Sequence, residues 1–342
     1  NTEIIDNKKV KINNQFIGNL NGLKLELDLK VDAPDSDIKS LKKASRQSVM
    51  PEILNRIDQI IKTSLIEVKK DLKIYWKTFP IAALRKGKDY LSPEIELIID
   101  DMIEVKDKTK LSIFLQKWIK DKIETELESL IKLKKIKNEN SKIRALAYNL
   151  YENNGVVIRE KVKNILLKLD QKDRKILRDV GVKFGRYHIF LFKLFKPSVV
   201  SLRILLWKNF NGEELNLLPP TFGLNFVNNI KYKNKKFMLL CGFEKFDNFF
   251  VRIDILERLF IEIINSNENK SDKIKLIPKM LNLLGCNKEN FKKLLSEMGY
   301  KITLKDNEIF FKYSPKKNIK KKFFKKTTKE NPFEVLKNIS FN

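Results

Sequence analysis

Histidine and cysteine are almost absent from this sequence of 342 residues. The single histidine, His188, cannot build a two-histidine zinc motif, and the two cysteines, Cys241 and Cys286, lie in no CxxC pair. Two thiols cannot form a disulfide framework, so we expect core cysteines and a reducing, cytoplasmic compartment. No run of eighteen apolar residues occurs, and no membrane-spanning helix is therefore expected.

The phosphate-binding motifs of ATPases are also missing. The only Gly-Lys pair, Gly87-Lys88, is followed by Asp89 instead of Ser or Thr, and Ala82 stands where the first glycine of the loop is required. No Asp-Glu dipeptide occurs, so the acidic Mg²⁺-binding box of helicase motors is absent as well. We therefore expect no cofactor and no metal in this chain, and no ATP hydrolysis by it alone.

Negative charge is scarce relative to positive charge. Lys and Arg number 70 against 43 Asp and Glu, which leaves a formal net charge of +27. Such a surplus creates a field that attracts polyanions. Nucleic acid is the partner class that this charge favours, and an anionic membrane surface is the lesser alternative.

Periodicity predicts an α+β fold that is mostly helical. Two strand-hairpin-plus-helix modules are predicted at the N-terminal end, with hairpins at 9–27 and 72–84 and helices at 36–70 and 108–135. The modules indicate a possible duplication at an offset of 64 residues. This offset pairs the apolar residues Val10 with Ile74, Leu20 with Leu84 and Val49 with Ile113.

The remainder of the chain is predicted to contain a helical region with small β pairs and a basic tail. We expect three domains: a duplicated hairpin-plus-helix region over 1–137, a helical nucleic-acid-contacting region over 138–313, and a Lys-rich tail with a short terminal helix over 314–342. Within the second domain, residues 157–169 are expected to be helical and residues 237–241 extended.

The segment Asp179–Trp207 alternates cationic and aromatic side chains. Single-stranded nucleic acid is bound by this mixture, because cations contact phosphates and aromatic faces stack on bases. The candidate contacts in this segment are Lys183, Arg186, Tyr187, Lys193, Lys196 and Arg203. The candidate contacts in the tail are Lys320, Lys321, Lys322, Lys325 and Lys326. The alternatives are that the aromatic residues Phe184, Phe190 and Phe192 are core, which we favour, and that the tail only aids solubility.

Two further groups are interpreted without a catalytic role. His188 lies between Tyr187 and Ile189, an apolar setting, and we expect a core histidine with one ring nitrogen bonded to the backbone. The group formed by Asp100, Asp101 and Glu104 could bind Mg²⁺, but on a basic protein such carboxylates are more often solvated or paired with lysines. No catalytic residue is assigned.

Six blocks of the sequence stand in an order that is familiar from one protein family. They are FIGNLNGLKLELD at 16–28, IYWKTFPIAALRKGKDYLSPEIEL at 74–97, GVKFGRYHIFLFKLFKPSVVSLRILLW at 181–207, VRIDILERL at 251–259, MLNLLGCNKENFKKLLSEMGY at 280–300 and NPFEVLKNI near the end. Together they resemble the C-terminal accessory region of alphaproteobacterial DExH-type superfamily 2 helicases, relatives of the mitochondrial degradosome RNA helicases. The resemblance spans nearly the whole chain.

The resemblance implies the non-motor part of an ATP-dependent helicase that binds and guides single-stranded RNA or DNA. ATP and Mg²⁺ would be bound only by motor domains upstream in the same polypeptide, which agrees with the start at Asn1 instead of Met. The alternative is a scaffold that clamps the motor or recruits a degradosome-type partner such as an exonuclease. An independent hydrolase is the least favoured hypothesis, because no nucleophile–base pair or metal cluster is visible.

Overall fold

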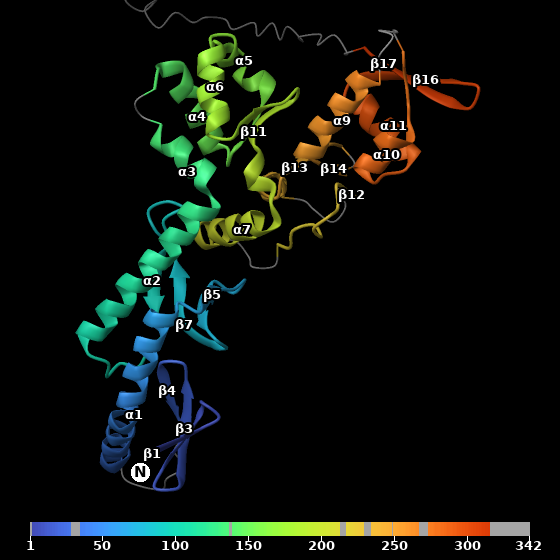
Figure 1. The fold of residues 1–342 in the computed structure, drawn as a ribbon. Helices are drawn as coiled ribbons and strands as arrows, with labels where there is room; N and C mark the ends of the chain where they lie inside the picture. Colours follow the sequence, from blue (N-terminus) through green and yellow to red (C-terminus); the bar gives the residue numbers. More distant parts are fainter. Residues whose placement is uncertain are drawn as a thin grey trace, which may run out of the picture.

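The computed structural model describes residues 2–28, 35–136, 139–212, 217–228, 234–247, 249–266 and 273–314. Two strand–helix modules lie at the N-terminal end, a mainly helical region follows, and a smaller α+β unit completes the described chain (Figure 1). The predicted α+β class with N-terminal strand modules is confirmed. Within these ranges no helix has both the length and the apolar character that crossing a bilayer requires.

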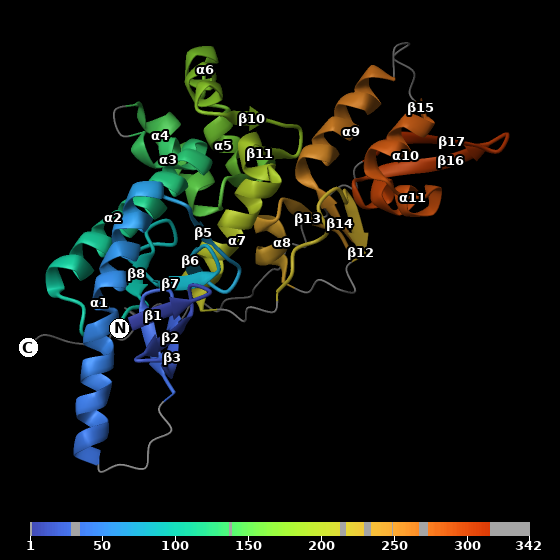
Figure 2. The same cartoon turned by 60° about the horizontal axis from the view of Figure 1, so that its bottom comes forward.

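Each N-terminal module is a four-stranded antiparallel meander followed by a long helix. Module 1 consists of β1 (Thr2–Ile5), β2 (Lys9–Ile12), β3 (Gln15–Asn21), β4 (Lys24–Leu27) and α1 (Asp35–Thr63). Module 2 consists of β5 (Ile66–Val68), β6 (Lys73–Trp76), β7 (Phe79–Arg85), β8 (Glu94–Leu97) and α2 (Val105–Glu126), with α3 (Glu128–Lys135) continuing from it. The two long helices α1 and α2 run side by side (Figure 2).

The two modules share details beyond their strand order. A β-bulge follows the second residue of β2 and also the second residue of β6. The backbone hydrogen bond from Leu20 N–H to Lys8 O recurs from Leu84 N–H to Leu72 O, and both measure 2.7 Å. A bulge interrupts the ladder at one particular position, so its recurrence at the same place indicates a common design. The structure therefore contains the duplicated modules that the sequence predicted.

The offset of 64 residues holds only as far as β7. The connection between β7 and β8 is six residues longer than that between β3 and β4, so equivalent positions beyond it differ by 70. Val49 of α1 therefore corresponds to buried Ile119 of α2, whereas the predicted partner, Ile113, is 65 % exposed. The pairing of the helices at an offset of 64 was wrong, because matching apolar residues cannot reveal a short insertion.

The middle region packs five short helical elements and one longer helix around a three-stranded sheet of order β10-β11-β9. Its elements are α4 (Ser141–Glu152), β9 (Val156–Ile158), η1 (Arg159–Val162), α5 (Lys163–Leu166), α6 (Gln171–Asp179), β10 (Val182–Phe184), β11 (His188–Leu191), η2 (Phe192–Phe195) and α7 (Pro197–Asn211). The prediction of one helix over 157–169 was wrong. The β-branched residues Val156 and Val157 pair with β11 instead, and only short helical turns follow.

The C-terminal unit contains two three-stranded antiparallel sheets, of orders β12-β14-β13 and β15-β17-β16. Its elements are β12 (Phe226–Asn228), α8 (Lys235–Leu240), β13 (Phe243–Lys245), β14 (Phe249–Arg252), α9 (Ile253–Asn265), β15 (Ile274–Lys275), α10 (Pro278–Leu284), α11 (Lys288–Glu297), β16 (Tyr300–Lys305) and β17 (Glu308–Tyr313). The prediction of extended backbone over 237–241 was wrong. Asn234 caps a helix there, because its side chain accepts the N–H of Phe237 at 2.9 Å.

Buried apolar side chains form one large core and several smaller ones. The large core begins with Val10 in module 1, continues through module 2 and the middle region, and ends at Leu206 of α7. It therefore combines side chains from the first predicted domain, such as Leu133, with side chains from the second, such as Ile143. A second core, with Phe249, Phe291 and Phe311 at its centre, belongs to the C-terminal unit. The candidate site lies between the regions that these two cores stabilise.

Candidate functional site

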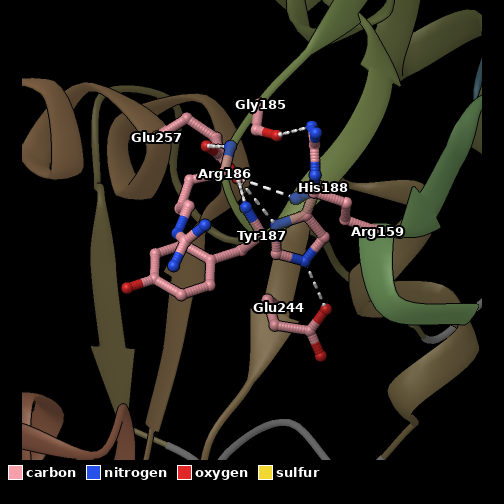
Figure 3. A network of polar contacts seen from close by, with 7 residues as sticks. All are labelled: Arg159, Gly185, Arg186, Tyr187, His188, Glu244 and Glu257. Carbon is pink, nitrogen blue, oxygen red and sulfur yellow. Dashed lines mark hydrogen bonds and ion pairs between the residues drawn. The ribbon is translucent and has the colours of Figure 1, made fainter. Parts of the chain in front are cut away.

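The turn between β10 and β11 rests on helix α9 of the C-terminal unit. Glu257 of α9 accepts the backbone N–H groups of three successive residues: Arg186 through a short hydrogen bond, and Tyr187 and His188 at 2.8 Å each (Figure 3). Glu257 is only 6 % exposed, and hydrogen bonds to a buried carboxylate offset much of the cost of removing it from water. These bonds fix the turn, and with it Arg186 and Tyr187, against α9.

His188 is buried between two carboxylates. Its Nδ1 lies 3.3 Å from Oε1 of Glu257, and its Nε2 lies 2.8 Å from Oε2 of Glu244 in β13 (Figure 3). Burial lowers the pKa of His188, but its hydrogen bonds to the two carboxylates and their charges outweigh burial, so the pKa rises above its ordinary value. Burial was predicted correctly, whereas the predicted backbone partner of the ring was wrong.

Glu244 is the complementary partner in this network. Burial raises the pKa of its carboxyl group, but the hydrogen bond and the charge of His188 outweigh burial, so the pKa falls below its ordinary value. Both shifts favour an imidazolium between two carboxylates over a neutral imidazole. The network joins β11 of the middle region to β13 and α9 of the C-terminal unit.

A cavity of about 740 Å³ opens beside the network, and its wall combines cationic and aromatic side chains with apolar ones such as Leu166 and Met298. The cationic side chains of the wall are Arg159, Lys163, Arg174, Arg186 and Lys245. The aromatic side chains are Tyr187, Phe246 and Tyr313, with His188 beside them, and the acidic side chains are Glu160 and Glu244. The excess of cations makes the cavity suited to an anionic ligand.

The cations of the wall differ in how freely they can meet a ligand. Arg159 Nη1 donates to the carbonyl of Gly185 at 2.8 Å, and Arg174 Nη2 donates to the carbonyl of Leu166 at 3.0 Å. Arg186 instead lies over the ring of Phe260, with its guanidinium carbon 5.4 Å from the ring centroid. Arg186 and Lys245 are both exposed and form no ion pair with any described residue. Their N–H groups are therefore the most available for a phosphate.

The aromatic residues of the wall differ in how much of each ring is open to a ligand. Tyr187 is half-buried and meets Phe260 edge to face with ring centroids 5.5 Å apart. Burial, together with the hydrogen bond to Tyr300, raises the pKa of Tyr187 well above its usual range, so this phenol stays neutral. Tyr313 is 47 % exposed, which leaves part of its ring open for stacking.

The structure separates the residues that the sequence grouped as candidate contacts. Only Arg186 and Tyr187 lie in the wall of the cavity. Lys183, Lys193 and Lys196 are exposed but lie outside that wall, and Lys193 pairs with Glu128 at 3.4 Å. The tail candidates lie outside the described residues, and they are Lys320, Lys321, Lys322, Lys325 and Lys326.

The prediction that Arg203 contacts nucleic acid was wrong. Arg203 is completely buried in α7 and cannot contact a nucleic-acid strand at the surface. Its Nη1 donates to the carbonyl of Leu240 at 3.2 Å, and its Nη2 donates to the carbonyl of Asn154. These carbonyls lie at the end of α8 and just beyond the end of α4, where helices carry partial negative charge. Arg203 is therefore a structural cation that ties two helix ends to α7.

Sequence reasoning missed most of the cavity wall. Three of the missed residues come from consecutive elements of the middle region, Arg159, Lys163 and Arg174, and two come from the C-terminal unit, Lys245 and Tyr313. No local pattern linked these two groups. The aromatic residues of the predicted segment divide between core and surface. The favoured core interpretation is confirmed for Phe190, which is 5 % exposed, whereas Phe192 is 48 % exposed.

The remaining candidates for chemistry have structural roles. Asp100 is buried and lies 3.6 Å from Arg46, so it pairs with an arginine instead of a lysine. Among the described residues, no three His, Cys, Asp or Glu side chains are grouped so that they could hold a metal ion. Burial raises the pKa of the Cys241 thiol to about 12, which keeps it protonated and unreactive at neutral pH.

Comparisons of the chain with protein-family descriptions, with curated proteins and with solved structures found no match.

Proposed function

We propose that this chain binds and guides single-stranded nucleic acid, RNA by preference, as the non-motor C-terminal part of an ATP-dependent DExH-type helicase. The observation that supports binding is the gathering of five cations and three aromatic residues in one cavity wall. Cations hold the phosphates of a single strand, and aromatic rings stack on its bases. The net charge of +27 would raise the rate at which such a polyanion associates.

The aromatic residues of the wall favour a single strand over a duplex. Bases within a duplex are stacked on one another and cannot turn their faces toward a protein. Tyr313 and Phe246 line the cavity, and their rings can stack only on a base whose face is free. We therefore expect paired strands to bind only through their phosphates.

The place of this activity within a helicase rests on the resemblance of the six sequence blocks. Motor domains upstream in the same polypeptide would bind ATP and Mg²⁺, and this chain would hold the strand that they move. The compartment that we propose is the cytoplasm. A partner such as an exonuclease would act on the strand after it leaves this region.

Binding of a labelled single-stranded oligouridine and of an RNA duplex of equal length tests the proposal. We expect the single strand to bind more tightly at every salt concentration, because only it gains base stacking of about 1–3 kcal/mol per base. Equal affinities, or binding of neither, would contradict the proposal.

A scaffold role is the second candidate, and exposed apolar side chains on α9 favour it. Ile261 and Ile264 are three residues apart on one helix face and are 57 % and 56 % exposed. If the region clamps a motor or recruits a protein, replacing both by Ser would abolish co-purification of that protein and leave oligouridine affinity unchanged. Loss of RNA affinity with retention of the protein would exclude this role.

A further inference from the structure

Glu244 is an acidic side chain in the wall of a cationic cavity. Its Oε2 accepts a hydrogen bond from Nε2 of His188 at 2.8 Å, and its Oε1 accepts the backbone N–H of Lys245 at 3.1 Å. Each carboxylate oxygen has two lone pairs, so each can accept one more hydrogen bond. The side chain of Glu244 is 13 % exposed and borders the cavity, from which these acceptors can be reached.

The orientation of Glu244 is fixed by the network behind it. Glu257 holds His188 from one side through Nδ1, and His188 holds Glu244 through Nε2 (Figure 3). Glu257 already provides one carboxylate that can balance a positive charge on His188. Balancing that charge therefore does not by itself explain why Glu244 is a second carboxylate. The lowered pKa of Glu244 keeps it ionised, and it is therefore an acceptor only.

An ionised carboxylate offers two acceptors side by side and no donor. Guanine presents two adjacent donors, N1–H and N2–H, on its Watson–Crick edge. Adenine and cytosine present one amino group next to a ring acceptor, and uracil presents one N–H between two carbonyl oxygens. Only guanine can therefore satisfy both carboxylate oxygens, because every other base turns at least one acceptor toward the negative charge.

We propose that Glu244 makes the cavity selective for guanine in a single strand. The inference rests on the proposed function and adds base recognition to it. Arg186 and Lys245 would hold the phosphates that flank the base, and Tyr313 would stack on its ring. Glu257 and His188 are positioning residues in this arrangement, since they touch Glu244 or the turn and not the base.

The test uses the 342-residue chain and nonamers of uridine with G, A, C or U at the central position. A bidentate base contact discriminates by about tenfold, so we expect the G nonamer to bind about tenfold more tightly than the A nonamer. Glu244→Gln removes the paired acceptors and should bring the ratio close to one. Glu160→Gln is the matched control, because Glu160 borders the same cavity and pairs with Lys163 at 3.3 Å. The control should keep the tenfold ratio.

A second variant covers the case in which Glu244→Gln does not fold. Glu244→Asp keeps the charge but withdraws the carboxylate, so the G-to-A ratio should fall while the affinity for plain oligouridine is retained. Equal affinity for all four nonamers, or an undiminished ratio in a folded Glu244 variant, overturns guanine selectivity and leaves the proposed function intact. Failure of every nonamer to bind overturns both.

Discussion

The guanidinium of Arg186 lies over the ring of Phe260, and the backbone of the same residue is bound by Glu257. This arrangement fixes the position of the charge while its N–H groups stay free to meet a phosphate. We predict that Arg186→Ala weakens oligouridine binding by about 1.5 kcal/mol, or about tenfold, without unfolding the protein. Fluorescence anisotropy measures the affinity, and circular dichroism measures the fold.

Lys183 provides the matched control for Arg186. It is exposed on neighbouring β10 but lies outside the cavity wall. Lys183→Ala should reduce the affinity much less than Arg186→Ala, although both remove one positive charge. Equal losses of affinity in the two variants would mean that binding depends only on the overall charge and not on the cavity.

His188 and Glu244 make the stability of the protein depend on pH. The pKa of His188 is raised in the folded state, so its contribution is fully present below the unfolded value of 6.5 and is lost as the pH rises through the folded value. The pKa of Glu244 is lowered, so its contribution is present above the unfolded value of 4.5 and is lost as the pH falls through the folded value. The pair therefore stabilises the fold most between pH 4.5 and pH 6.5, the unfolded pKa values of Glu244 and His188.

Urea denaturation at a series of pH values tests this coupling. The wild type should lose stability as the pH rises above the folded pKa of His188, and His188→Gln should lack that component of the pH dependence. Parallel pH profiles for the two proteins would show that the imidazole is not charged in the folded state.

Short elements mark the limit of what the sequence could predict. The hairpins and most of each long helix in the two modules were predicted because alternation and helical spacing are local signals. The helix predicted over 36–70 was too long, because α1 ends at Thr63 and residues 66–68 form β5. The run at 237–240 is apolar at every position and is too short for either period to show, and the Asn234 cap decided in favour of a helix. The six-residue insertion between β7 and β8 was not predicted either, because it shifts the positions of the apolar residues without changing the kinds of residue that follow.

The packing of module 1 on module 2 depends on a glycine at the turn between β3 and β4. Gly22 has a φ of +63°, and a Cβ there would lie 3.0 Å from the Cβ of Phe79. We predict that Gly22→Ala destabilises the protein by about 2 kcal/mol, because it adds crowding to the strain of a left-handed backbone. Urea denaturation measures the change in the free energy of unfolding.

Gly212 separates the two contributions. It has almost the same φ, +62°, but a Cβ there would meet nothing within 4 Å. Gly212→Ala should therefore cost only about 1 kcal/mol, the backbone strain alone. If both variants lose the same stability, the turn of module 1 does not press against Phe79 in solution.

At the scale of the whole molecule, the cavity is built from segments that the fold brings together. The local alternation of charge and aromatic residues identified Arg186 and Tyr187, but it also selected Arg203, whose place on the buried face of α7 no charge pattern could show. Lys245 and Tyr313 belong to the C-terminal unit, so they join the cations of the middle region only through the contact between the two regions. That contact is made through Glu257, which no sequence signal singled out.

The affinity of the full chain for labelled oligouridine, measured across a range of salt concentrations, tests the central claim most directly. The wall contains five cations, and if each neutralises one phosphate, log K should fall with log[salt] at a slope of about −3.5 for a single strand. A slope near this value that becomes shallower in Arg186→Ala would support a cationic cavity for single strands. An affinity that does not change with salt would contradict it.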